Sequence, residues 1–174
     1  MSRTLSRRIG GIGLLAIPAL TLAALPALAQ QAVILLRHAE QTQTGGGMMD
    51  GDPPLNEAGQ RRAASLAESL REAGVTAIVT SQYLRARQTA EPLAAALRIE
   101  PVVVKKDDAV GLTDALRRQS GATVLVVGHS DTIPGMLKAL GHQQALEFPK
   151  TEFNNAWIVV PRPEGAPVVT RVRF

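Results

Sequence analysis

The stretch AVILLRHAE, residues 32–40, decides the fold. Its run of β-branched and leucyl side chains is typical of a strand buried on both faces, as in a parallel sheet. The run ends abruptly at Arg37, His38 and Glu40. In open α/β sheets the ligand crevice lies beyond the carboxyl ends of the strands, so this histidine, preceded by a guanidinium, is placed to meet a substrate. The alternative is a strand that simply runs into a polar loop, and the later segments decide between the two.

Residues 1–29 have the features of a secretory signal peptide. Three arginines precede an apolar run over residues 9–29, which ends in the small-x-small pattern Ala27-Leu28-Ala29. A retained membrane anchor is the alternative, because about 20 apolar residues can span a bilayer. Two prolines inside the run and its small-residue end favour cleavage, with both the Sec and the twin-arginine export routes open. The pattern predicts an exported protein, periplasmic or extracellular, whose catalytic domain covers residues 30–174.

Composition excludes several classes of function. Three of the 19 Lys and Arg residues lie in the leader and none of the 15 Asp and Glu residues does, so cleavage lowers the net charge from +4 to +1. This balance gives no reason to expect nucleic acid as a partner. The absence of Cys excludes disulfides, thiolate catalysis and Cys-ligated zinc. No membrane contact is expected once the signal peptide is removed.

Beyond residue 40, segments with helical periodicity alternate with short apolar runs. Residues 41–54 contain four glycines and two prolines, which predicts a loop beside the end of the first strand. Helices are predicted from an Asn56 cap to Gly74, from the region after Ser81 to about Arg98, and near residues 110–119 and 132–140. Pro92 predicts a kink or a break in the second of these helices. Strands are predicted at residues 75–80, 101–104, 123–127, 156–160 and 168–174.

This order of elements predicts an α/β fold, a three-layer α/β/α sandwich with a mainly parallel sheet and a C-terminal edge hairpin. Polar residues follow three of the strands, at Arg37-His38, at residues 81–85 and at Gly128-His129. With right-handed crossovers these strand ends share one edge of the sheet, which brings two histidines and at least two arginines together. Such a set suits an anion, because Arg binds phosphate oxygens in bidentate geometry and a neutral His can attack phosphorus.

Four segments of the chain resemble the motifs of the histidine phosphatase (phosphoglycerate mutase-like) superfamily. They are LLRHAE, with Ala39 where the family usually has Gly, then DPPLNEAGQRRA, SQYLRARQTA and VVGHSDTIP, in family order between residues 34 and 134. The resemblance implies that His38 is phosphorylated and that Arg37, Arg85 and His129 hold the phosphoryl group. It also selects Arg85 over Arg87, which we expect at the surface. His38 must be neutral to attack, and a hydrogen bond from its other ring nitrogen to a backbone carbonyl would fix the tautomer.

The general acid is not assigned by any motif. Members of the superfamily often use a Glu or Asp from a separate loop to protonate the leaving oxygen. Asp131 is the first choice, since it follows His129 by two positions, although it could instead cap the next helix. The other candidates are Asp107, Asp108, Asp52 and Glu40.

The sequence therefore predicts an exported phosphatase that needs no cofactor or metal and acts on a small phosphorylated substrate or a phosphoprotein through a phosphohistidine. A phosphoglycerate mutase-type transfer is a weaker alternative, because the short chain leaves little room to shield the intermediate from water. A metal site built from His38, Glu40, His129 and Asp131 is another, although nearby arginines would repel a metal ion. A phosphate-ligand binder without catalysis is the third. The physiological substrate and the oligomeric state are not encoded in any recognisable pattern.

Overall fold

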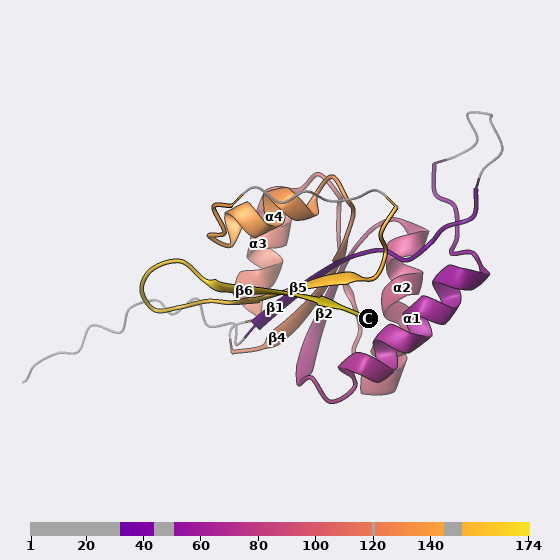
Figure 1. The fold of residues 1–174 in the computed structure, drawn as a ribbon, viewed down its shortest axis with the longest axis horizontal. Helices are drawn as coiled ribbons and strands as arrows, with labels where there is room; N and C mark the ends of the chain where they lie inside the picture. The colour runs from indigo at the N-terminus through magenta and orange to yellow at the C-terminus, as the bar shows by residue number, and fades with distance from the viewer. Residues whose placement is uncertain (1–31, 44–50, 120, 145–150) are drawn as a thin grey trace, which may run out of the picture.

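The computed structural model describes residues 32–43, 51–119, 121–144 and 151–174 (Figure 1). These residues form one six-stranded sheet in the order β3-β2-β4-β1-β5-β6. The first four strands in that order are mutually parallel, and β5 and β6 are antiparallel to their neighbours. The elements in chain order are β1 (Ala32–Arg37), α1 (Glu57–Leu70), β2 (Val75–Ser81), α2 (Leu84–Leu97), β3 (Val102–Val104), α3 (Ala109–Arg118), β4 (Thr123–Gly128), α4 (Ile133–Ala139), β5 (Asn155–Val160) and β6 (Val168–Arg173).

The helices cover the sheet on both faces, as Figure 1 shows, so the predicted three-layer α/β/α sandwich is confirmed. Alternate residues of β1 and β4 enter two separate cores, because successive side chains of a strand point to opposite faces. Ile34 and Leu125 pack with α1 and α2, whereas Leu35 and Val126 pack with α3 and α4. The predicted hairpin at the C-terminus is β5 and β6, and β6 forms one edge of the sheet.

Two helices differ from the sequence prediction, one in where it ends and the other in its continuity at a proline. Helix α1 starts after the predicted Asn56 cap, whose side chain accepts a hydrogen bond from the Gly59 N–H at 2.8 Å, but it ends at Leu70 rather than Gly74. A turn separates the two positions, and Gly74 has a φ of +69°, a conformation that glycine adopts without steric cost. Helix α2 continues through Pro92 without a break. Burial of Ala90 and Leu93 against the sheet offsets the hydrogen bond that this proline cannot make.

The predicted signal peptide and residues 44–50 of the predicted glycine-rich loop lie outside the described residues. The described residues contain no helix that is long and apolar enough to cross a membrane.

Candidate active site

The pairing of β1 with β4 brings the two predicted histidines together. Arg37 lies opposite Gly128 in this parallel register, and the His38 N–H extends the pairing by donating to the Gly128 carbonyl at 3.0 Å. His38 and His129 therefore leave the same edge of the sheet side by side, with their ring centroids 5.2 Å apart. Both side chains are 4% exposed.

The ring of His38 is held in one tautomer. Its Nδ1 lies 2.7 Å from the Ala39 carbonyl oxygen, which can only accept, so Nδ1 carries the proton. Its Nε2 then has a free lone pair and accepts a hydrogen bond from Arg85 Nε at 3.2 Å. Burial, together with the positive charges of Arg37 and Arg85, lowers the pKa of His38 to about 4. The imidazole is therefore neutral near pH 7 and its Nε2 faces the cations, as a nucleophile toward phosphorus requires.

Helix α2 presents Arg85 to this edge of the sheet. The Thr89 hydroxyl accepts a hydrogen bond from the Ala39 N–H at 2.9 Å and donates to the Arg85 carbonyl at 2.7 Å, which ties the first turns of α2 to the segment after β1. The Arg85 guanidinium carbon lies 4.3 Å from the ring centroid of Tyr83. Arg87 lies on the same helix but is exposed. Side chains two residues apart differ by about 200° around the helix axis, so Arg85 and Arg87 point to opposite sides.

His129 is fixed by β2 and its following turn. Its Nε2 is 2.8 Å from the Ser81 hydroxyl, and the ring of Tyr83 meets its ring edge-on with the centroids 5.3 Å apart. Burial lowers the pKa of His129 to about 3, and the positive charges of Arg85 and Lys106 act in the same direction. In the absence of an anion, the site therefore holds two neutral histidines between cationic groups.

Arg37 completes the group of side chains at this edge. Its guanidinium carbon lies 3.9 Å from the centroid of Phe153, in the segment that leads into β5. Burial, with the nearby charge of Arg85, lowers the pKa of Arg37 below its usual value. Two guanidinium groups and two neutral imidazoles thus surround a position at which an anion could bind.

Asp131 does not fit the predicted role of general acid. Its Oδ2 accepts a hydrogen bond from Lys106 Nζ at 2.6 Å, and its side chain is 61% exposed. Partial burial raises the pKa of Asp131, but the hydrogen bond and charge of Lys106 outweigh this effect and lower the pKa overall. Asp131 also does not cap α4, because the N-cap position of this helix is Thr132. An ionised carboxylate paired with a lysine is a poor proton donor.

The other acidic candidates have local partners as well. Glu40 forms a two-pronged ion pair with Arg62 on α1, with its oxygens 2.6–3.0 Å from the guanidinium nitrogens, and this pairing lowers the pKa of Glu40. Asp108 caps α3 by accepting the Gly111 N–H at 2.7 Å. Asp52 accepts the Leu84 N–H at 2.6 Å and lies 3.6 Å from Arg85 Nη1, and Asp107 is exposed. Among these five carboxyl groups, Asp52 is the one that pairs with Arg85, the arginine that contacts His38.

The alternative of a metal site is wrong for the described residues. The carboxylate of Glu40 is directed to Arg62 and that of Asp131 to Lys106, so neither converges with the two imidazoles. No group of three or more His, Asp or Glu side chains in the described part of the chain is arranged to hold a metal ion.

Sequence reasoning missed the residues that support the site. Ser81, Tyr83 and Thr89 lie within the motif SQYLRARQTA, but the motif predicts no role for them. In the structure Ser81 and Tyr83 contact His129, and the Thr89 hydroxyl accepts the Ala39 N–H. Lys106 and Phe153 carried no signal in the sequence. Both reach the site from loops far along the chain, and a loop residue has no periodicity that could indicate what it contacts.

Comparisons with known proteins agree with this fold. A sequence model of the histidine phosphatase superfamily (branch 1) matches residues 33–107, and this match supports the resemblance to that superfamily. Among curated proteins it is similar to "Probable phosphoglycerate mutase GpmB" of Yersinia enterocolitica, with 36% identity over 72 residues, which cover 40% of this chain and 34% of that protein. The match thus spans about a third of the length of that relative.

Solved structures cover more of the chain. The "putative phosphohistidine phosphatase SixA" of Agrobacterium tumefaciens is 25% identical with a TM-score of 0.59, and the match covers 75% of this chain and 92% of that one. A protein histidine phosphatase SixA complexed with tungstate is 20% identical with a TM-score of 0.64, over 82% of this chain and 96% of that one. At 20% identity, the similarity to the tungstate complex is evidence for a shared fold.

Proposed function

We propose that this protein is a phosphatase that hydrolyses a phosphoester or a phosphoprotein through a phosphohistidine formed on His38. One observation supports this above the others: the Ala39 carbonyl and Arg85 orient a neutral His38 with its Nε2 lone pair toward the cationic edge of the sheet. A phosphoryl group in transfer spreads negative charge over three oxygens, and fixed cations that stabilise this charge account for most of the catalysis in such reactions.

The reaction proceeds in two displacements. The Nε2 lone pair of His38 attacks phosphorus, the bond from phosphorus to the leaving atom breaks, and that atom keeps the electron pair and takes up a proton. Water then attacks phosphorus, the bond to Nε2 breaks with its electron pair returning to the imidazole, and one proton of the water passes to solvent. Arg37, Arg85 and His129 surround the phosphoryl oxygens in both steps, so the products are inorganic phosphate and the protonated leaving group.

The contacts of the acidic residues bear on which leaving groups react. Glu40, Asp108 and Asp131 are engaged by Arg62, the α3 N-terminus and Lys106. Asp52 is engaged by the Leu84 N–H and by Arg85, so none of these four carboxylates is suited to supply the proton. We expect water to protonate the leaving atom, which suffices when the leaving group is weakly basic, as in aryl phosphates, diphosphates and phosphohistidine. Unactivated alkyl phosphates should react more slowly.

A rapid-quench experiment tests the proposal. With an aryl phosphate labelled in the phosphoryl group, the wild-type protein should accumulate acid-labile, base-stable label during turnover and release inorganic phosphate. His38→Ala should trap no label, whereas His142→Ala, which changes the histidine after α4, should behave like the wild type. Full labelling of a folded His38→Ala protein, or hydrolysis that requires an added metal ion, would contradict the proposed route.

Export is a separate proposal that rests on the leader. The arginines, the apolar run and the Ala27-Leu28-Ala29 end support cleavage before Gln30, which would deliver the phosphatase to the periplasm or the medium. Intact-mass measurement of the protein recovered outside the cytoplasm should show Gln30 as the first residue. Recovery of the full-length chain from the membrane fraction would contradict it.

A further inference from the structure

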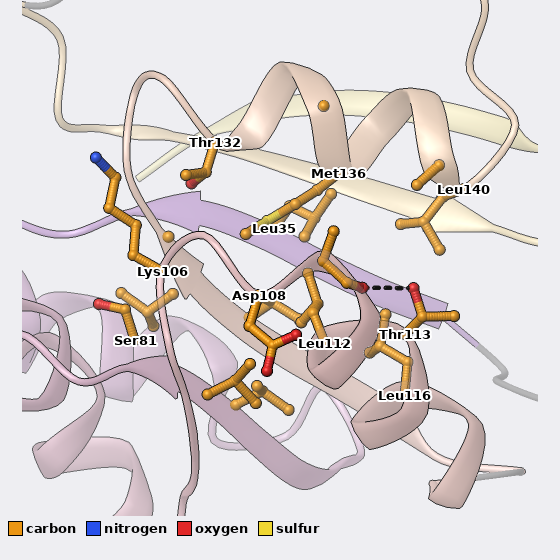
Figure 2. Close-up of a pocket in the computed structure, with 18 of the residues that line it drawn as sticks. Leu35, Ser81, Lys106, Asp108, Leu112, Thr113, Leu116, Thr132, Met136 and Leu140 are labelled. Carbon is orange, nitrogen blue, oxygen red and sulfur yellow. Dashed lines mark hydrogen bonds between the residues drawn. The ribbon is translucent and has the colours of Figure 1, made fainter.

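A cavity of about 710 Å³ lies between α3 and α4, over the face of the sheet opposite α1 and α2. Figure 2 shows Leu112 and Leu116 of α3 directed toward Met136 and Leu140 of α4 across this space, with Leu35 of β1 behind them. Leu112, Met136 and Leu140 are only partly buried, so their apolar surface remains open to the cavity. A cavity with such walls favours an apolar occupant.

One end of the cavity reaches the candidate active site. Ser81 and His129 contribute to its lining, together with Lys106 and Thr132, which Figure 2 shows at the same end as Ser81. The ring of His129 lies between this end and the nucleophile, with its centroid 5.2 Å from that of His38. His38, Arg37 and Arg85 do not line the cavity, so it extends away from the phosphoryl position rather than enclosing it.

The charges at this entrance are arranged for a group that leads away from a phosphate. Lys106 comes from the loop before α3 and Asp131 from the loop before α4, and their ion pair bridges the two loops at the entrance. This pair neutralises Asp131, which would otherwise repel an anion. Deeper in the cavity the side chains of Leu112, Met136 and Leu140 offer no hydrogen-bond partner to a polar group.

We propose that the substrate of this phosphatase is a phosphorylated amphiphile, a small molecule whose phosphoryl head lies at His38 while its apolar body lies between α3 and α4. This inference rests on the proposed function and adds the substrate class to it. The volume falls within the range of about 300–1,000 Å³ that is usual for small-molecule sites, which favours such a molecule over a protein segment. Continuity of the cavity with His129 and Ser81 places the apolar body on the leaving-group side.

A series of para-alkylphenyl phosphates isolates the contribution of the apolar body. The methyl, butyl and octyl members share a phosphoryl group and nearly the same leaving phenol, so chain length is the main variable. Each methylene that leaves water is worth up to about a fourfold gain in kcat/KM. We expect kcat/KM to rise from methyl to octyl, measured below the micelle-forming concentration, and to level off once the chain extends beyond α4.

Variants on α3 provide the matched control. Leu112→Trp fills the cavity, whereas Val110→Trp adds the same side chain at a position that is 73% exposed and does not line it. The octyl-to-methyl ratio of kcat/KM should fall toward one in Leu112→Trp and stay at the wild-type value in Val110→Trp. An equal ratio in both variants would overturn the assignment of the cavity.

Binding to inactive His38→Ala separates this inference from the proposed function. Calorimetry should show tighter binding of the octyl ester than of the methyl ester, and Leu112→Trp added to His38→Ala should remove the difference. If this binding result is obtained but the wild type hydrolyses no member of the series, the cavity assignment is supported and the proposed phosphatase activity is contradicted. Turnover through His38 with no dependence on chain length would do the reverse. If Leu112→Trp lowers kcat/KM only for a phosphohistidine protein and not for the alkylphenyl phosphates, the cavity binds a segment of a protein substrate. That result would overturn the proposal of an amphiphilic substrate.

Discussion

Mild acid should destabilise this fold through two buried histidines, at a pH well above the range in which its carboxylates titrate. His38 and His129 are each 4% exposed, and the structure holds the pKa of His38 at about 4 and that of His129 at about 3. In the unfolded chain both return to about 6.5. Because the unfolded state binds more protons between these values, the free energy of unfolding falls as the pH drops below about 6.5.

The magnitude follows from the pKa values. At about pH 5 both imidazoles are still mainly neutral in the folded protein, while each is protonated in the unfolded chain, about 1.5 units below its pKa there. One pKa unit corresponds to about 1.4 kcal/mol, so each histidine lowers the free energy of unfolding by about 2 kcal/mol and the pair by about 4 kcal/mol. A loss of this size is a large part of the roughly 5–15 kcal/mol of a typical domain.

Urea denaturation, followed by the fluorescence of Trp157, measures the effect. Trp157 is the single tryptophan of the chain and is 1% exposed, so its emission reports the core directly. The wild type should lose about 4 kcal/mol between about pH 7.5 and pH 5, and the double variant His38→Gln, His129→Gln should lose little. His142→Gln should keep the wild-type dependence. Equal losses in the wild type and the double variant would show that the two histidines are not held neutral in the fold.

Three further predictions concern individual side chains. Arg85→Ala should lower kcat/KM by about 10²–10³ and Arg87→Ala by less than about twofold, and a larger loss in a folded Arg87→Ala would contradict the assignment. Glu40→Gln should cost about 1–2 kcal/mol in urea denaturation because it breaks the partly buried pair with Arg62, whereas Glu57→Gln, in the exposed pair with Arg61, should cost nothing measurable. Asp131→Asn should keep kcat within about threefold on an aryl phosphate, and a loss near a hundredfold would restore it as the general acid.

The fold was predictable because its information is local. The apolar runs of β1 and β4 have no polar residue, so they indicate central strands, and their carboxyl ends indicate the edge at which chemistry is expected. The register of Arg37 with Gly128 then follows from the pairing, and it places His38 beside His129. Arg85 could be placed at the same edge because it lies in the first turn of α2, shortly after the end of β2.

The partners of the acidic residues were not predictable in the same way. Proximity to His129 along the chain makes Asp131 the first candidate for the general acid, but its ion pair with Lys106, which belongs to another loop, lowers its pKa. Glu40 follows His38 by two positions, but its carboxylate is directed away from the site because it pairs with Arg62 on α1. Side-chain pairing between loops depends on tertiary geometry, which no periodicity in the sequence records.

The neutrality of His129 has a consequence for ligand binding. In the free site, burial and the nearby cations lower its pKa to about 3, so it cannot be a charged donor. An anion between Arg37, Arg85 and His129 reverses this balance, because one negative charge about 4 Å away is worth about 4 kcal/mol at an effective dielectric constant of 20. That energy corresponds to about three pKa units for each charge, so a dianion should raise the pKa of His129 above about 6.

Anion binding should therefore draw a proton onto the site. Sulfate is a suitable probe because it stays dianionic in mild acid, so any proton taken up belongs to the protein. Calorimetric titration at about pH 6, in two buffers of different ionisation enthalpy, should give binding enthalpies that differ by the amount expected for uptake of up to one proton. His129→Gln should reduce this difference, and His142→Gln should leave it unchanged. Enthalpies that are independent of the buffer in the wild type would mean that His129 stays neutral and holds the phosphoryl group as a dipole, through a single N–H donor rather than a charge.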